Sequence, residues 1–546
     1  MSATLETADV PEHTDEVSDE QPLPDARVLE DKTPEWCRMS AASSALVFVL
    51  GLVLIVFANR PLWHSDLWDH INYGQHILHT HSVAKTEPLL VLADGMPFVN
   101  TAWGAQVLMA AAYESPKLGL PSLQFAYAAM ITACLAVIAA FVLRKSRSVI
   151  FAILSAVILL AVNWQQFLII RPQLPGLTFF CTLITLLQTG IVRRRWSWFC
   201  LPLMFAVWAN VHGSFSVGLL VFGLHIVGTS ADLLLRTRSV RCSLLNRSVV
   251  RQILLLQLCA SAVLLNPNGL ALYDAVLRVG SHPNIASMYE WDPLTLRMKQ
   301  GQAFAVAAII LLLVLRLSPR RLKSTELLPL VVTGLLALWS SRMINWFAPV
   351  AAMTIGCHGA AAWRCLRKQI RPLLPTQRTG LWTVVNLGLC WIFFGLTSFG
   401  LQTVHGKPTD PARLVSAETP RNLLSYFHES KPLPAGVAFV PAEWAGFLMQ
   451  FGPTELRPMV NLHVHVIPEE VWNDYLRLIS GPSDWNGLLD RYGIDLVITD
   501  KLKQPRLTKL IADSADFAKD FEDAQSVVFR RRTNHPDETS THGLHP

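Results

Sequence analysis

Charged residues are scarce in this sequence. Only 16% of the 546 residues are Asp, Glu, Lys or Arg, against roughly 25% in soluble domains, while 51% are apolar and the mean hydropathy is +0.35. We therefore expect lipid to solvate much of the chain. The net charge of +6 does not indicate nucleic-acid binding, because the Lys and Arg residues stand in short clusters between apolar runs and form no continuous patch.

Cysteine pairs with metal-binding spacing are absent. None of the nine cysteines stands in a CxxC pair, so no structural zinc site is expected. No cysteine follows Cys390, and the C-terminal part must therefore be stable without disulfides. The chain also lacks HExxH and GxxxxGK[ST], and no GxGxxG stands where a strand would meet a helix, so nucleotide binding has no support.

A cleavable signal peptide is also absent from the start of the sequence. Residues 1–40 are rich in Pro, Asp and Glu and show no apolar periodicity. This composition predicts a disordered, acidic cytoplasmic tail, and the first apolar run is then a retained membrane anchor. A second disordered tail is expected at residues 533–546.

Eleven apolar runs follow the first tail. A hydrocarbon core about 30 Å thick requires roughly 20 helical residues, and all but two of the runs have about this length. The runs are 41–59, 121–143, 148–169, 172–192, 197–211, 214–235, 249–265, 301–317, 326–340, 343–363 and 380–401. We predict an α-helical, polytopic membrane domain over 41–402 with about eleven transmembrane helices and a first outer loop at 60–120.

Clusters of Lys and Arg occur at every second connection between these runs. The clusters lie at 144–147, 193–195, 236–251, 316–323 and 364–378. Because short basic loops remain in the cytoplasm, this alternation predicts a multi-pass protein of the inner membrane with a cytoplasmic N-terminus. The segments then placed on the outer face are 63–103, 171–172, 210–213, 266–291, 341–342 and the C-terminal part.

From about Thr403 the composition is that of a soluble domain. Short apolar runs at 437–440, 459–467, 495–499 and 526–530 predict strands. Helices are expected from Ala442 and at 469–479 and 485–492. We predict a small extracytoplasmic α/β domain over 403–532, in which the strands near Val437 and Ile494 are adjacent and buried on both faces.

Acidic residues and histidines concentrate in the first outer loop. Asp66, Asp69 and His70 closely follow the first run, and Glu87 precedes Pro88. Two carboxylates here could deprotonate a nucleophile or hold a divalent cation, although the sequence does not require one. Alternatively, Asp66 caps a helix and Asp69 faces water.

In this loop the chain resembles a bacterial group of multi-span proteins with the GT-C glycosyltransferase architecture, related to the protein O-mannosyltransferases and the lipid-A aminoarabinose transferases. The loop pattern D-x-W-x-H-L-x-x-G-x-x-I is represented by Asp66, Trp68, His70, Gly74 and Ile77. Further matches follow in order at Glu87-Pro88-Leu89, Trp103, Arg171-Pro172-Gln173, Trp208 to Gly213, Asn266 to Leu270, Glu290-Trp291 and Ser341-Arg342.

The resemblance implies an inverting membrane glycosyltransferase that transfers a sugar from a polyprenyl-phosphate donor to an acceptor on the outer face. It places Asp66 at the catalytic centre, as general base for the acceptor. Arg171 and Arg342 would grip the donor phosphate with their planar guanidinium groups. The other residues expected to contact substrate are Asp69, His70, Glu87, His212 and Glu290. The expected partners are membrane lipid and the polyprenyl-phosphate donor, and no metal ligand is predicted.

Two departures from the group pattern favour an alternative. Ala102 stands where the group has an acidic residue before Trp103, and Asn461-Leu462-His463 replaces an acidic-Gly-Arg triplet. If these positions bind substrate, this chain has a changed specificity or no activity. The alternative is a non-catalytic scaffold or partner in envelope glycan assembly. In that case Asp66 is only the counter-ion of Arg171 or Arg342.

Overall fold

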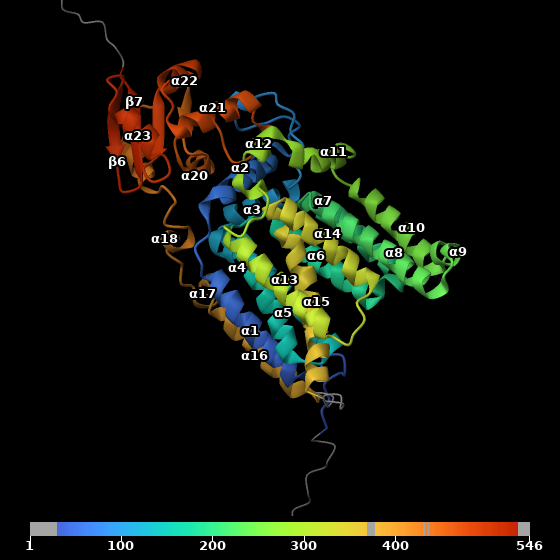
Figure 1. Cartoon of the computed structure of the whole chain (residues 1–546). Helices are drawn as coiled ribbons and strands as arrows, with labels where there is room; N and C mark the ends of the chain where they lie inside the picture. The colour runs from blue at the N-terminus through green and yellow to red at the C-terminus, as the bar shows by residue number, and fades with distance from the viewer. Residues whose placement is uncertain (1–29, 368–376, 430–431, 435, 533–546) are drawn as a thin grey trace, which may run out of the picture.

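A computed structural model describes residues 30–367, 377–429, 432–434 and 436–532 (Figure 1). Most of the first predicted tail and all of the second lie outside these residues. A helix occupies each of the eleven predicted runs. The helices are α1 (Ala41–Ala58), α4 (Gly119–Ser146), α5 (Val149–Val162), α6 (Gln173–Thr189), α7 (Ser197–Val211), α8 (Phe215–Thr237), α10 (Arg247–Val263), α13 (Lys299–Leu317), α14 (Ser324–Trp339), α15 (Ile344–Leu366) and α16 (Gly380–Gly395).

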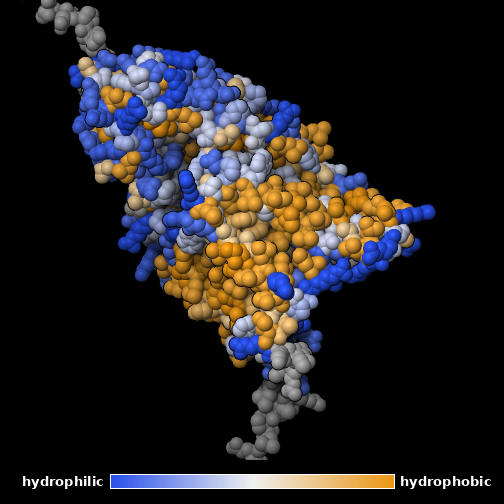
Figure 2. Space-filling view, in the orientation of Figure 1, coloured by the Kyte–Doolittle hydropathy of each residue, from blue (hydrophilic) through white to orange (hydrophobic). Residues whose placement is uncertain are grey.

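Not all of these helices are long enough to be transmembrane spans on their own. By length and composition α1, α4, α8 and α13 suffice, and a fifth span results if α16 is joined to α17 (Ser398–His405) across a bend of 94°. Helices α5, α7 and α14 are apolar but shorter. On the face seen in Figure 2, apolar side chains cover the middle of the bundle, whereas the C-terminal domain is mainly hydrophilic. The chain is therefore a membrane protein, and the full count of eleven spans stays a prediction.

Helix α15 forms the core of the bundle. It is buried along nearly its whole length and packs against α4, α5, α13 and α14. Small residues permit this close packing: a Cβ atom added at Gly356 would lie 2.8 Å from a methyl group of Val142 on α4. Close approach at small residues is a common way for helices to associate in a membrane. Lipid is itself apolar, so there is little hydrophobic free energy to be gained by moving apolar side chains from lipid into a helix contact.

The described residues of the five basic clusters lie together at one end of the bundle. Arg251 donates a hydrogen bond to the carbonyl of Arg194 at 2.9 Å, and Arg364 donates to the carbonyl of Ser146 at 3.1 Å. Cations of the remaining connections border two neighbouring cavities at the same end, and these cations are Lys145, Arg236, Arg320, Arg321 and Lys323. This is the arrangement that alternating topology requires, whereas the side of the membrane on which the clusters lie stays a prediction.

At the opposite end, shorter helices form the base of the site. They are α2 (His64–Thr80), α3 (Trp103–Glu114), α11 (Ala271–Arg278) and α12 (Pro283–Ala286). Helix α2 packs directly on α3, and a Cβ atom at Gly74 would lie 2.1 Å from the carbonyl oxygen of Gln106. The glycine of the first-loop pattern is thus required by the contact between the two helices.

The C-terminal domain contains a five-stranded mixed sheet of order β4-β3-β5-β7-β6. Its strands are β3 (Val437–Phe439), β4 (Arg457–Pro458), β5 (Leu496–Asp500), β6 (Phe517–Glu522) and β7 (Ser526–Arg531). Its helices are α18 (Pro411–Leu414), α19 (Asn422–Glu429), α20 (Ala442–Phe451), α21 (Glu469–Ser480), α22 (Trp485–Arg491) and α23 (Pro505–Ala512). Strands β3 and β5 are parallel neighbours, with Ala438 opposite Leu496, and both are fully buried. The predicted adjacency is confirmed. Strand β6 and helices α18, α19 and α23 were not predicted.

The predicted strand at 459–467 is wrong. Only two residues, Arg457 and Pro458, pair with β3, and the chain then leaves the sheet as a loop with a single 3₁₀ turn at Val464–Val466. The polar backbone groups find partners elsewhere: the amide of Leu462 donates to Asp69 on α2 at 3.1 Å, and the amide of His463 donates to the side chain of Asn461 at 2.9 Å. The apolar run therefore connects the C-terminal domain to the helices.

Helix α20 makes the second contact between the C-terminal domain and α2. The side-chain amide of Asn72 donates to the carbonyl of Gly446 at 2.9 Å. A Cβ atom at Gly446 would lie 2.4 Å from Oδ1 of Asp69, so only glycine permits this approach. The two contacts fix the domain over the end of the bundle where the polar loops gather (Figure 1).

Candidate functional site

A cavity of about 460 Å³ lies between the ends of the helices and the C-terminal domain. Its walls come from α2, the loop before α3, the N-terminal ends of α6 and α8, the segment after α11, η7 (Ser341–Met343) and the 462–465 loop. Six of the eight predicted site residues line it, and they are Asp66, His70, Arg171, His212, Glu290 and Arg342. The structure thus brings together side chains from five widely separated segments.

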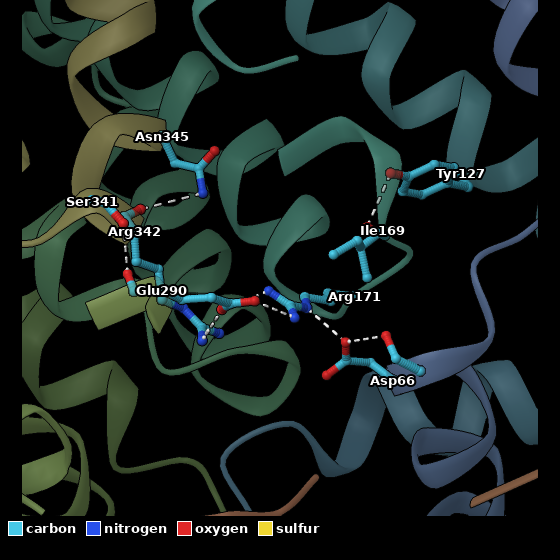
Figure 3. A network of polar contacts seen from close by, with 9 residues as sticks. Asp66, Tyr127, Ile169, Arg171, Glu290, Ser341, Arg342 and Asn345 are labelled. Atoms are coloured by element: carbon cyan, nitrogen blue, oxygen red, sulfur yellow. Dashed lines mark hydrogen bonds and ion pairs between the residues drawn. The ribbon is translucent and has the colours of Figure 1, made fainter. Parts of the chain in front are cut away.

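Four charged side chains in the cavity form a continuous ionic network (Figure 3). Nε of Arg171 donates to Oδ2 of Asp66 at 2.9 Å, and its two terminal nitrogens donate to the two oxygens of Glu290 at 2.8 and 2.6 Å. Nη1 of Arg342 donates to Oε2 of the same Glu290 at 3.0 Å. Two cations and two anions therefore balance inside the wall.

Backbone contacts hold the two arginines in place. Tyr127 on α4 donates to the carbonyls of Phe167 at 2.6 Å and Ile169 at 3.0 Å, which fixes the segment leading to Arg171. On the other side, the Ser341 hydroxyl donates to the carbonyl of Glu290 at 2.9 Å, which ties η7 to the acidic residue that Arg342 contacts. These hydrogen bonds restrain the backbone next to Arg171 and Arg342 and so hold the two guanidinium groups in position.

The two arginines differ in how many of their donors are used. All three side-chain nitrogens of Arg171 donate within the network, whereas Arg342 uses only Nη1 there. The guanidinium of Arg342 lies over the Trp291 ring, 5.5 Å from its centroid. Its side chain is 25% exposed, against 14% for Arg171. Arg342 is therefore the arginine with donors left for a ligand.

The network keeps its carboxylates ionised. Burial is the largest single effect and raises the pKa of Asp66, but the charge and hydrogen bond of Arg171, together with the smaller effects of its other neighbours, hold that pKa below the ordinary value. Burial likewise opposes ionisation of Glu290, and Arg342 and Arg171 together hold the pKa of Glu290 below its usual range. Asp66 is thus a proton-accepting carboxylate at neutral pH.

Asp69 and Glu87 do not line the cavity. Asp69 is 1% exposed and accepts the amide of Leu462, and burial raises its pKa well above the ordinary value. Glu87 accepts the Tyr73 hydroxyl at 2.8 Å and the amides of Leu89 and Leu90, and burial raises its pKa as well. Both carboxyl groups hold loops behind the wall, and the geometry offers them no direct contact with a ligand in the cavity.

A chain of hydrogen bonds fixes the tautomer of His70. The backbone amide of Ala102, which can only donate, binds Oδ1 of Asn100 at 3.1 Å. The Asn100 amide group then donates to Oε1 of Gln106 at 2.6 Å, and Nε2 of Gln106 donates to Nδ1 of His70 at 3.2 Å. Burial lowers the pKa of His70 to about 4, so the ring is neutral and carries its proton on Nε2.

Two further histidines of the wall have the same arrangement. Nδ1 of His212 accepts the amide of Ser214 at 3.0 Å, and Nδ1 of His282 accepts the amide of Asn284 at 3.3 Å. Burial lowers the pKa of His212 to about 3 and that of His282 below its ordinary value. Each neutral ring is left with an Nε2–H donor, so the cavity offers hydrogen bonds without additional positive charge.

The sequence analysis did not predict three groups of residues at this site. Asn100 and Gln106 are buried polar residues in a loop and a helix, where no spacing marks them. His282 lies in a segment without a recognisable motif. His463 and His465 line the cavity from the C-terminal loop, and the only signal was the departure from the group pattern at 461–463.

The residues present do not form a metal-binding set. Within the described residues, no group of three or more His, Cys, Asp or Glu side chains is placed to hold a metal ion. Asp66 is engaged by Arg171 and Asp69 by the Leu462 amide, so the two carboxylates of the first loop do not form one ligand pair. No role at this site is therefore assigned to a metal.

Neither a protein family model nor a curated protein sequence matches this chain. Several solved structures are similar, among them the following two. The oligosaccharyltransferase of Archaeoglobus fulgidus in its apo form is 11% identical, with a TM-score of 0.51 over 84% of this chain and 69% of that one. ArnT from Cupriavidus metallidurans, solved with undecaprenyl phosphate bound, is 12% identical, with a TM-score of 0.50 over 91% of this chain and 99% of that one.

This chain has a GT-C-like fold. The predicted fold class, a polytopic helical domain followed by a small α/β domain, is confirmed. At these identities the likeness establishes the fold, and the function has to be argued from the site.

Proposed function

We propose that this protein is an inverting membrane glycosyltransferase that transfers a sugar from a polyprenyl-phosphate donor to an acceptor. The observation that carries this proposal is the ionic network of Asp66, Arg171, Glu290 and Arg342 in a cavity at the polar end of a GT-C-like bundle. The network supplies an ionised base and a partly unused guanidinium within one cavity, which are the two groups that such a transfer needs.

Arg342 is assigned to the donor phosphate. Arg342 already donates one hydrogen bond to a carboxylate oxygen of Glu290. A phosphate oxygen is the natural partner of its remaining guanidinium donors. When the bond between the sugar and the phosphate breaks, negative charge accumulates on the leaving polyprenyl phosphate. A fixed cation at that position stabilises the transition state more than the ground state.

Asp66 is assigned to the acceptor as general base. The acceptor hydroxyl attacks the anomeric carbon while its proton passes to the Asp66 carboxylate, and the electrons of the broken C–O bond leave with the phosphate. The Arg171 and Ser65 contacts of Asp66 both use Oδ2. Attack from the face opposite the phosphate inverts the anomeric centre.

Arg171 is assigned to positioning. Since all three of its nitrogens are occupied by Asp66 and Glu290, it orients the base and separates the two carboxylates. His70 and His212 offer Nε2–H donors that can bind phosphate or sugar oxygens without forming ion pairs.

The location proposed for this reaction is the outer face of the inner membrane. The described residues of the five basic clusters gather at the end of the bundle opposite the cavity, and short basic loops favour the cytoplasm. The cavity and the C-terminal domain would then face outward, with the N-terminus inside the cell.

The pairing of Asp66 with Arg171 also favours the second candidate, a non-catalytic scaffold. A buried ion pair needs no substrate to explain it, because charged residues buried in membrane proteins are usually paired with one another. In the scaffold the network would serve only to hold α2 against α6 and η6 (Tyr289–Trp291).

An assay with defined lipids tests the proposal. The protein in nanodiscs is incubated with undecaprenyl-phosphate-linked hexoses and pentoses together with crude envelope glycan as acceptor, and release of undecaprenyl phosphate is followed. The proposal expects release that depends on both protein and acceptor and is lost in the Arg342→Gln variant. A scaffold gives no release with any donor.

A further inference from the structure

A cluster of rings forms the wall of the cavity beside the ionic network. The rings of His70 and His463 are 5.2 Å apart, and Tyr73 packs against His463 from behind at 4.3 Å. Phe98 lies 6.4 Å from His463 and 6.2 Å from His465. The first loop and the C-terminal loop thus contribute to one aromatic surface, and all of these rings except Tyr73 border the cavity.

His463 has a buried nitrogen that no protein group satisfies. Within the described residues Nδ1 of His463 has no hydrogen-bond partner, although the atom is inaccessible to solvent. A buried polar atom without a partner is costly, and native structures keep one mainly where something else binds it. The atom itself is covered, but it belongs to a residue of the cavity wall, so rotation of the ring about its Cβ–Cγ bond would allow a ligand there to become its partner.

The chemistry of this wall is neutral. Burial lowers the pKa of His463 well below its ordinary value and that of His465 to about 4, so both rings are uncharged at neutral pH. A neutral imidazole both donates and accepts hydrogen bonds, which matches hydroxyl groups. An apolar ring such as Phe98 packs against the C–H face of a sugar. A carboxylate placed against these rings, away from Arg342, would be desolvated next to neutral groups.

We propose that His463, His465, His70 and Phe98 form a subsite for an uncharged, hydroxyl-bearing sugar ring, and that His463 determines which ring is accepted. This inference rests on the proposed glycosyl transfer and deepens it, because the sugar lies beside the ionic network that would carry out the reaction. The ring can belong either to the donor or to the acceptor, and the chemistry of recognition is the same for both.

Ligand-observed NMR tests the subsite. The full chain is placed in nanodiscs, since sugar-based detergents would compete, and saturation transfer is measured with methyl hexopyranosides of gluco, galacto and manno configuration. Each has a matched uronate in which a carboxylate replaces the CH₂OH group. At least one neutral glycoside should bind, and its uronate should bind at least about tenfold more weakly, a difference of about 1.4 kcal/mol.

Substitutions in the cavity wall test whether the glycoside binds at His463 and His465. His463→Phe keeps a ring of similar size and removes both nitrogens, and it should weaken binding of the neutral glycoside about tenfold or more. His465→Phe provides a second variant if the first does not fold, and the exposed His405→Phe is the control, which should bind like the unmodified protein. Unmeasurable binding, equal binding of the uronate, or unchanged binding in both wall variants overturns the proposal.

Competition separates the two sources of the sugar. If an intact undecaprenyl-phosphate hexose displaces the glycoside and undecaprenyl phosphate alone does not, the subsite holds the donor sugar. If the glycoside stays bound with the donor present, the subsite holds the acceptor. Glycoside binding without any donor turnover refutes the proposed function and leaves the subsite standing, whereas turnover without glycoside binding refutes the subsite alone.

Discussion

Arg171 donates from Nε to Oδ2 of Asp66 over 2.9 Å, joining two residues that are 105 positions apart in the sequence. The same guanidinium clamps Glu290 with its two remaining nitrogens. Since all three of its nitrogens already donate to these carboxylates, Arg171 serves to organise them, and the guanidinium with nitrogens left for a ligand belongs to Arg342.

Loss of Arg171 should therefore be a defect of folding. Arg171→Gln leaves Asp66 and Glu290 with one cation between them, and removing one partner of a buried ion pair costs roughly 3–5 kcal/mol. We expect a clear drop in the thermal unfolding midpoint and in the amount of protein in the membrane. An unchanged midpoint would show that the network contributes little to stability.

Arg342→Gln should have the opposite effect, with a loss of activity and little change in stability. This residue makes one contact in the network, so the unfolding midpoint should stay close to that of the unmodified protein. Donor turnover should fall by about 10²–10³-fold, the usual cost of removing one donor aimed at developing negative charge. Arg342→Lys keeps the positive charge but lacks the planar pair of N–H donors, so its turnover rate should lie between those of Arg342→Gln and the unmodified protein. Full activity of Arg342→Gln would contradict its role at the phosphate.

The docking of the C-terminal domain can be tested at Gly446. Gly446→Ala places a Cβ atom 2.4 Å from Oδ1 of Asp69, and overpacking of this kind costs roughly 1–3 kcal/mol. The matched control is Gly487→Ala on α22, where nothing lies within 4 Å. The thermal unfolding midpoint should fall for Gly446→Ala and should stay the same or rise slightly for Gly487→Ala. Equal behaviour of the two would mean that the domain does not pack closely on α2.

The helical part of the fold could be predicted because lipid imposes long apolar runs, and a helix occupies every run that hydropathy marked. The 459–467 loop could not be predicted, because a short apolar run is equally consistent with a strand, and its amide at Leu462 binds Asp69 from a distant part of the chain. Pairing of Asp66 with Arg171 was foreseen as an alternative. The different engagement of Arg171 and Arg342 depends on side-chain geometry that no sequence pattern encodes.

Stability should fall in mild acid because of the neutral histidines. His212 has a folded-state pKa of about 3, below the ordinary value of 6.5, so the unfolded chain binds more protons between these values. Its contribution to stability is complete above about pH 6.5 and is lost as the pH falls toward 3, by about 2 kcal/mol at pH 5. Asp69 and Glu87, whose pKa values are raised, oppose this trend.

A variant isolates the histidine contribution from these opposing groups. The drop in unfolding midpoint between pH 7.5 and pH 5 should be smaller for His212→Gln than for the unmodified protein, since glutamine does not titrate. Identical pH dependence in the two proteins would mean that His212 is not held neutral by the fold.

The most direct test of the account is Asp66→Asn, with protein abundance and glycan transfer measured in the same membranes. Asparagine keeps an oxygen for the Nε of Arg171, and Arg171 stays paired with Glu290 through two hydrogen bonds, so abundance should remain near normal. Removing the general base should lower the transfer rate by about 10²–10⁴-fold. Unchanged transfer at unchanged abundance would contradict Asp66 as the base and leave the scaffold as the better description of this protein.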